Sequence, residues 1–290
     1  MKFVDVKNDV AFHKIFGNAH KTITLISFLN AVMQLEGGSK VLSVTIENPY
    51  LYPVLHGGKT VIIDIRATDH MGRHFIVEMQ VADKEGFEKR TQFYAARDYA
   101  AQIDRGEQYA ELRPTHFIGI LDFSISSNPN YYSHHQTIDV ETGECLLKDV
   151  QYFFIELPKF KKKISTLKTM MDKWTFFIKN AENLTLIPAG VTDKGLKTAY
   201  VEADRHNWSK AELNAYYDAG AIAADQIQER IKAEQIGVQI GVEIGVEKGK
   251  IEKEMEAVLG LHENGVPISI IAKSLNLTED RVNDIIRDKK

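Results

Sequence analysis

The sequence has 290 residues, of which 44% are hydrophobic and 26% are charged, and these are the values of an ordinary globular protein with a sizeable core. Its formal net charge of −4 at pH 7 argues weakly against a nucleic-acid partner, although binding depends on the charge of one face rather than on the total. Because the single cysteine, Cys145, excludes an intrachain disulfide, and neither a membrane span nor a signal peptide is visible, we expect a cytoplasmic protein without membrane contact.

Two helices and a strand are predicted in the first fifty residues. Asn8 is a helix cap and Gly17 a helix stop, so a short helix is expected between them. A second helix is expected over residues 21–35, with one apolar face formed by Ile23, Ile26, Leu29, Val32 and Met33. Residues 41–47 are predicted to form a strand, and residues 50–58 a connection to the next element.

A β-hairpin is predicted next, and the rest of the chain is arranged around it. Apolar and polar residues alternate over residues 61–68, a polar turn follows at residues 69–73, and a second strand covers residues 75–81. Gly72 can adopt the positive φ that such a turn requires.

This hairpin carries two carboxylates in otherwise apolar strands. Glu78 and Gln80 are two residues apart and share a face, and Asp64, which stands 14 residues before Glu78, joins them if the register aligns the strands. Buried carboxylates need a partner, and Mg²⁺ is a natural one because it prefers oxygen ligands. We therefore interpret this face as a candidate metal site.

The second half of the core alternates a helix with strands. Residues 88–105 have helical spacing, with Arg90, Tyr94, Arg97 and Ala101 on one stripe. Residues 115–123 and 151–157 read as strands, the first of them apolar throughout as expected for a strand covered on both faces, and residues 124–135 read as a loop. This order of elements predicts an α/β sandwich with a mixed sheet.

Several segments together resemble one known family. They are Asp9, Phe12, Lys14, Phe16 and Gly17; Leu29-Asn30; Asp64 with Glu78-Met79-Gln80; Arg90 and Tyr94; and residues 154–160. In this order they resemble the PD-(D/E)XK nuclease family transposases, also called recombination-promoting nucleases, over residues 5–185. Ile63-Asp64 corresponds to the "PD" and Glu78-Met79-Gln80 to the "(D/E)XK". Gln80 replaces the lysine, and His13 stands where a second basic residue is common.

The resemblance implies a restriction-endonuclease-like α/β fold, with a mixed sheet flanked by helices and here followed by a helical C-terminal extension. It implies a bacterial, metal-dependent DNA endonuclease of low sequence specificity, linked to recombination, horizontal gene transfer or phage defence. Three ligands for Mg²⁺ or Mn²⁺ are implied: Asp64, Glu78 and the Met79 carbonyl. Gln80 would orient the attacking water or the phosphate, and Arg90 would clamp a phosphate. Asp9 and Lys14 are secondary candidates from the first helix.

A structural interpretation of the same residues stays open. Asp64 can pair with Arg66 or Arg73, and Glu78 with Arg90, in ion pairs without a metal. Lys14 can be a solvated helix residue. On that interpretation the protein is a catalytically inactive DNA-binding or assembly protein that keeps the nuclease fold. The adjacent histidines at positions 134 and 135 are assigned to the loop, because nothing near them has zinc-ligand spacing.

A run of lysines follows the last predicted strand. Lys161, Lys162 and Lys163 are its centre, and within the run only Asp172 is acidic. We expect these three lysines, with Lys14, to track DNA phosphates in a salt-sensitive way. The alternative is a solvated lysine face in front of a helix expected over residues 164–179.

We expect three domains: a nuclease-like domain over residues 1–190, a helical segment over residues 191–253, and a helix-turn-helix-like unit over residues 254–290. Within the segment, Ser209 and Glu212 form a capping box. A four-residue repeat then places glycines at positions 237, 241, 245 and 249. Each glycine destabilises a lone helix by about 1 kcal/mol relative to alanine, so we expect either close helix–helix contact in a homo-oligomer or an adaptable linker.

The C-terminal unit is predicted to contain two short helices joined by a turn, with Thr278 capping the second. This second helix begins with acidic residues where a recognition helix would meet DNA, which favours a structural or protein-contact role.

Overall fold

The computed structural model describes residues 1–51 and 60–288. Two compact units, Met1–Ile222 and Ala223–Lys290, make up the chain, and each is described by itself. The predicted connection over residues 50–58 lies outside the described residues except for Tyr50–Leu51, which form strand β2.

The first unit is built on a six-stranded mixed sheet with the order β1-β4-β5-β6-β8-β7. Its strands are β1 Val44–Ile46, β4 Ile65–Asp69, β5 His74–Gln80, β6 Thr115–Leu121, β7 Tyr132–His135 and β8 Val150–Glu156. The three central strands β5, β6 and β8 are parallel, and the outer pairings are antiparallel. All seven residues of β6 are buried, as predicted for a strand covered on both faces. The predicted mixed sheet is confirmed.

The predicted hairpin is present, but its first strand is interrupted. β4 and β5 pair with Ile65 opposite Val77, and Gly72 has φ +79° in the turn between them. Val61–Ile62 form a separate strand, β3, which pairs with β2 in a two-stranded sheet. The backbone bends at Asp64, between the two strands, so the continuous strand predicted from residue 61 is wrong.

The predicted loop over residues 124–135 is also wrong in part, because its end forms β7 at the edge of the sheet. β7 is a four-residue, partly exposed edge strand without apolar alternation, so it gave no strand signal. The His134 ring stacks on Phe153 with centroids 4.3 Å apart, and His135 packs edge-on against Phe154. Each histidine therefore packs on one aromatic side chain of the neighbouring strand β8.

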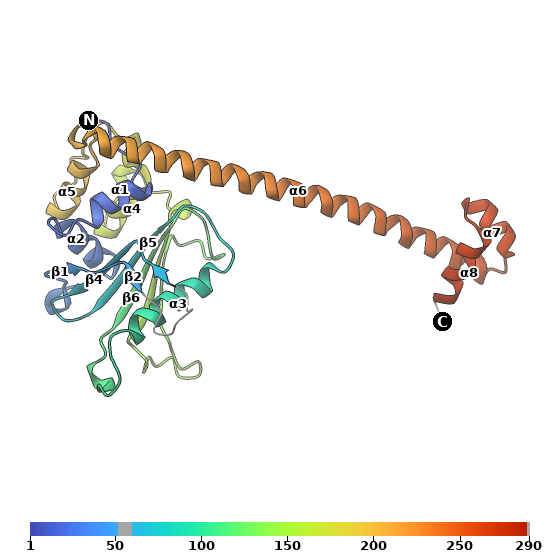
Figure 1. Cartoon of the computed structure of the whole chain (residues 1–290), viewed down its shortest axis with the longest axis horizontal. Coiled ribbons are helices and arrows are strands. Elements are labelled where there is room, and N and C mark those ends of the chain that lie inside the picture. Colours follow the sequence, from blue (N-terminus) through green and yellow to red (C-terminus); the bar gives the residue numbers. More distant parts are fainter. Residues whose placement is uncertain (52–59, 289–290) are drawn as a thin grey trace. The chain divides into compact units, whose positions relative to one another are not determined.

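Four helices pack on one face of this sheet, as Figure 1 shows: α1 Asp9–Phe16, α2 Ile23–Val32, α4 Met170–Asn180 and α5 Lys194–Ala203. Aromatic side chains at their centre pack against one another and against strand residues such as Val77 and Ile155; they are Phe12, Phe16, Phe28, Trp174 and Phe177. Asn8 caps α1 as predicted, accepting from the Val10 and Ala11 N–H groups.

Two helices differ from their predicted form. The buried face of α2 is formed by Leu25, Phe28, Leu29 and Val32, whereas Ile23 and Ile26 are only half-buried, so the predicted apolar face was rotated. The helix expected over residues 164–179 begins at Met170, where the Thr169 hydroxyl accepts from the Asp172 N–H. Short 3-10 turns occupy Gly37–Ser39, Tyr109–Glu111, Leu157–Lys159, Ile164–Thr166, Ala181–Asn183 and Arg205–Asn207.

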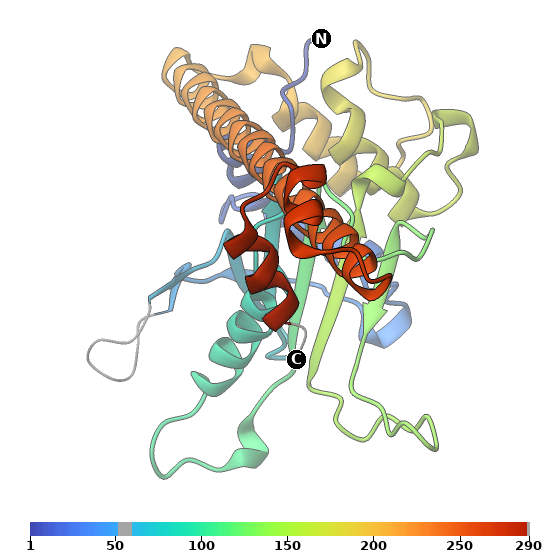
Figure 2. The same ribbon diagram turned by 90° about the vertical axis from the view of Figure 1, so that its right-hand side faces the viewer.

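One helix, α3 Phe87–Ala100, covers the opposite face of the sheet. Figure 2 shows it, in teal, running alongside the strands. Phe87 and Ala95 pack against Ile76, Phe117 and Phe154 in a second apolar core. Because side chains alternate along a strand, Glu78 and Gln80 lie on the same face of β5 as Ile76, toward α3.

The helical extension consists of α6 Lys210–Glu263, α7 Ile268–Leu275 and α8 Glu279–Asp288. α6 begins with the predicted capping box, in which the Ser209 N–H donates to Glu212 at 2.7 Å and the Glu212 N–H donates to Ser209 Oγ at 3.2 Å. The C-terminal helices share a core of their own, formed by Val258, Ile271, Ala272, Val282 and Ile285. Across the described residues, none of the helices has the length and hydropathy of a membrane span.

Candidate functional site

The β4–β5 hairpin brings Asp64 and Glu78 together. Ile65 lies opposite Val77, and one further step in the same register sets Asp64 against Glu78. The Asp64 N–H donates to Glu78 Oε1 at 3.1 Å, and the Met79 N–H donates to Asp64 Oδ2 at 2.8 Å. These two hydrogen bonds tie the Asp64 carboxylate to the backbone of β5 and the Glu78 carboxylate to the backbone just before β4, so the hairpin itself holds the two groups together.

Gln80 and Arg90 extend this arrangement toward α3. The Gln80 side-chain amide donates to Glu78 Oε2 at 2.9 Å, and the Arg90 guanidinium donates to Gln80 Oε1. Arg90 also lies 5.6 Å from the centre of the Phe87 ring. The Arg90 guanidinium thereby fixes the orientation of the Gln80 amide. Gln80 in turn lies between the Arg90 guanidinium and the Glu78 carboxylate.

Burial dominates the electrostatics of the two carboxylates. Glu78 is only 4% exposed, and burial together with the nearby Asp64 charge raises its pKa to about 8. Burial also raises the pKa of Asp64, although the hydrogen bond from the Met79 N–H partly offsets this effect. Two neighbouring carboxylates that are partly or fully removed from water repel each other when ionised, and a bound divalent cation would relieve both the repulsion and the desolvation. The oxygen-rich donor set therefore fits Mg²⁺ or Mn²⁺.

The arginines that could make this arrangement purely structural have other partners. Arg66 pairs with Asp98 at 2.5 Å, and Arg73 pairs with Asp69 at 2.6 Å. Both arginines are therefore engaged with carboxylates other than Asp64. Since Arg90 contacts Gln80, none of the three arginines considered as partners forms a salt bridge with the Asp64–Glu78 pair.

Helix α1 adds two groups beside Asp64. Asp9 and His13 are four residues apart on one face of the helix, with His13 Nε2 3.5 Å from Asp9 Oδ1. The candidate ligand atoms of Asp9, His13 and Asp64 all lie within 4.8 Å of one another, the one such set in the described part of the chain. The sequence marked Asp9 as a secondary candidate but missed His13, although the Asp-x-x-x-His spacing on a helix was visible.

The four predicted DNA-contact lysines occupy different environments. Lys14 pairs with Glu212 and lies 5.0 Å from the centre of the Trp208 ring, while Lys162 pairs with Asp172 at 2.5 Å. Lys161, Lys162 and Lys163 are all exposed. Lys14 and Lys162 therefore differ from the other two lysines in being paired with protein carboxylates.

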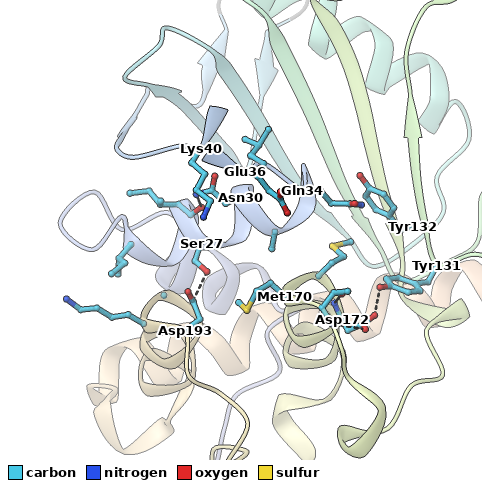
Figure 3. A pocket seen from close by; sticks show the side chains of 18 of the residues that line it. Ser27, Asn30, Gln34, Glu36, Lys40, Tyr131, Tyr132, Met170, Asp172 and Asp193 are labelled. Atoms are coloured by element: carbon cyan, nitrogen blue, oxygen red, sulfur yellow. Dashed lines mark hydrogen bonds between the residues drawn. The ribbon is translucent and has the colours of Figure 1, made fainter. Parts of the chain in front are cut away.

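A pocket of about 820 Å³ lies elsewhere in the first unit, beside α2, α4 and the start of α5 (Figure 3). Two of its acidic side chains already have protein partners: Asp193 accepts from Ser27 at 2.7 Å, and Asp172 accepts from Tyr131 at 2.7 Å as well as from Lys162. The residues that line it include neither Asp64 nor Glu78, so it is separate from the carboxylate site.

A sequence model of a known family matches most of the chain. The sequence model described as "PD-(D/E)XK nuclease family transposase" matches residues 6–233, a span that contains the carboxylate hairpin, α1, α3 and the first part of α6. No curated protein and no solved structure matches the chain.

Proposed function

Because this chain belongs to the PD-(D/E)XK nuclease family transposases, we propose that it is a metal-dependent DNA endonuclease of low sequence specificity. The observation that carries the proposal is the pairing of the buried Glu78 with the half-buried Asp64, neither of which forms a salt bridge with Arg66, Arg73 or Arg90. We place the activity in recombination, horizontal gene transfer or phage defence, in line with the family.

Asp64, Glu78 and the Met79 carbonyl are the proposed ligands of Mg²⁺ or Mn²⁺. A divalent cation held by these groups would lower the pKa of a bound water and neutralise charge at the scissile phosphate. Asp64 and Glu78 would contribute the negative charge that binds it, and the hydrogen bond that each carboxylate accepts from a backbone N–H fixes its position before a cation binds.

Gln80 and Arg90 act on the nucleophile and the phosphate. Gln80 is uncharged, so it orients a water or a phosphate oxygen through its amide and supplies none of the charge of a lysine. Arg90 uses one amino group on Gln80, and its remaining donors can bind a phosphate oxygen. Lys161 and Lys163, being exposed, attract the flanking phosphates without reading sequence.

We propose two partners: DNA and a second copy of the chain. The glycines of the α6 repeat lie in the middle of a 54-residue helix whose Ile and Val side chains, from Ile236 to Val246, are 50% to 63% exposed. Packing these side chains and the glycine backbone against a second α6 would bury apolar surface that one copy leaves in water.

Cleavage of supercoiled plasmid tests the nuclease proposal. Purified protein is incubated with plasmid in Mg²⁺, Mn²⁺, Ca²⁺ or EDTA, beside Asp64→Ala, Glu78→Ala and the exposed control Glu85→Ala. We expect cleavage in Mg²⁺ or Mn²⁺ that is lost in both site variants and kept in the control. Cleavage that survives in either site variant contradicts the assignment, and DNA binding without any cleavage supports the inactive assembly protein instead.

A further inference from the structure

Helix α1 presents two metal-ligating side chains to the edge of the carboxylate site, and one of them is a nitrogen donor. Asp9 and His13 lie on the same face of α1, and their side chains are 72% and 43% exposed, so both are accessible to a cation from solvent. Asp64 completes a three-residue set with ligand atoms within 4.8 Å of one another. These distances are short enough for one cation to contact all three groups after small side-chain rotations.

The position of α1 does not depend on a cation. The Asn8 side chain donates to the Tyr216 carbonyl at 3.0 Å, and Lys14 pairs with Glu212, so both ends of α1 are tied to the start of α6. Phe12 and Phe16 fix its other face in the core. Asp9 and His13 are therefore held beside Asp64 by the fold.

A His13–Asp9 ion pair does not by itself account for the set. An exposed pair of this kind contributes little to stability, and it leaves the Asp9 and Asp64 carboxylates next to each other. Glu78 adjoins Asp64, whose N–H donates to Glu78 Oε1 at 3.1 Å, but it lies outside this three-residue set. Two carboxylates and one imidazole therefore lie close enough to share one ion, and this composition suits a divalent cation.

We propose that Asp9, His13 and Asp64 form a second cation position next to the Asp64–Glu78 position, and that His13 makes it prefer Mn²⁺ or Co²⁺ over Mg²⁺. This inference rests on the proposed metal-dependent nuclease. The Asp64–Glu78–Met79 set offers oxygen alone, which suits Mg²⁺, whereas imidazole nitrogen binds transition metals in preference to Mg²⁺. Asp64, with lone pairs on both carboxylate oxygens, is common to the two positions.

Direct titration of the full-length protein with metal ions tests this site without using cleavage as the readout. Co²⁺ binding is followed by visible absorption, and Mn²⁺ and Mg²⁺ binding by calorimetry. His13→Ala is compared with His20→Ala, which removes an exposed histidine in the connection between α1 and α2. Asp9→Asn is the second site variant, because it changes an exposed carboxylate and leaves His13 in place.

We expect His13→Ala to weaken Co²⁺ and Mn²⁺ binding at one site by at least about 10-fold, to change the Co²⁺ spectrum, and to leave Mg²⁺ binding within about 2-fold. Asp9→Asn should weaken the same site, and His20→Ala should behave like the wild type. Equal Co²⁺ and Mn²⁺ affinities and equal spectra in the wild type and His13→Ala would overturn the inference.

The two proposals fail in different ways. If Co²⁺ binding depends on His13 but no cation supports cleavage, the nuclease proposal fails and the second cation position stands. If cleavage depends on Glu78 while cation binding ignores His13, the second position fails and the nuclease proposal stands.

Discussion

At the residue scale, the site depends on where the Glu78 side chain finds its hydrogen bonds. Its two oxygens accept from the Asp64 N–H and the Gln80 amide, both uncharged donors. Period-two alternation was enough to predict that Glu78 and Gln80 share a face, and the hairpin predicted that Asp64 joins them. It was not enough to place Asp9 and His13, because the approach of α1 to the sheet depends on tertiary packing that no local pattern encodes.

The lysines separate into structural and DNA-facing groups, and this division is a prediction. Lys161→Ala with Lys163→Ala should reduce the log–log salt dependence of DNA binding by about 0.9 for each phosphate that the protein no longer neutralises. Lys14→Ala should leave the slope unchanged and lower the free energy of unfolding by about 1 kcal/mol, because it removes the interactions with Glu212 and the Trp208 ring. Fluorescence anisotropy at several salt concentrations and urea unfolding measure the two effects. If the salt dependence of DNA binding falls in Lys14→Ala and not in the Lys161→Ala, Lys163→Ala variant, then Lys14 contacts DNA and the other two lysines do not.

At the scale of the elements, α3 matters because it carries Arg90 to the carboxylates. A fully buried carboxylate, Asp98, holds the other end of α3 against the hairpin: it accepts from Arg66 at 2.5 Å and from Thr115 at 3.2 Å and lies 3.0 Å from His74 Nδ1. Burial alone would raise the pKa of Asp98, but the hydrogen bonds with His74 and Arg66 outweigh it and lower that pKa. Asp98 is thus ionised when the fold is intact near neutral pH.

Asp98→Asn should destabilise the first unit by about 3 kcal/mol at pH 7, because it leaves Arg66 without its charged partner. The folded-state pKa of Asp98 lies below the unfolded one, so its contribution is complete above the unfolded value of about 3.9 and is lost as pH falls through the lowered folded value. Urea unfolding from pH 7 to pH 3 should therefore show that the difference in the free energy of unfolding between the wild type and the variant narrows below about pH 4. Asp104→Asn, at an exposed position, is the control. If that difference in the free energy of unfolding stays constant down to pH 3, the ionised Asp98 carboxylate does not stabilise the fold.

The elements that could be predicted are those with a strong period or a strong cap. α1, the β4–β5 turn, the buried strand β6 and the capping box of α6 all followed from local rules. The errors share one cause, which is tertiary context. The bend at Asp64 splits a strand whose alternation continues on both sides, and the rotated face of α2 follows from packing against α4 and α5. β7 adopts a strand conformation through its antiparallel pairing with β8 and not through its own sequence pattern.

At the scale of the whole molecule, α6 presents a choice between a lone helix and a paired one. A Cβ added at Gly237, Gly241, Gly245 or Gly249 would meet no atom within 4 Å in the described part of a single chain. Within one copy these glycines therefore lower helix stability without a packing benefit. Contact with a second copy would supply the benefit, since glycine lets helices approach closely.

Gly241→Leu with Gly245→Leu separates these two possibilities. If α6 pairs with a second copy through the glycines, the bulky side chains should convert an assembly of at least twice 32.8 kDa into a monomer in sedimentation velocity. If α6 is a lone helix, the same change should leave the mass at 32.8 kDa and raise helicity, since leucine favours helix over glycine. Gln228→Leu adds a similar bulk on another face of the helix and should leave the assembly intact. A wild-type monomer at micromolar concentration would contradict self-association.

The most direct test of the central claim is the rate of plasmid relaxation by the wild type and by Glu78→Gln, side by side in Mn²⁺. Glutamine keeps the shape of Glu78 and removes the charge that would hold the cation, and loss of even an outer partner of a metal ligand lowers activity about 10- to 100-fold. We therefore predict a loss of at least about 100-fold in the variant, with an unchanged far-ultraviolet circular dichroism spectrum. Equal rates in the two proteins would show that Glu78 does not hold a catalytic cation and would contradict the account.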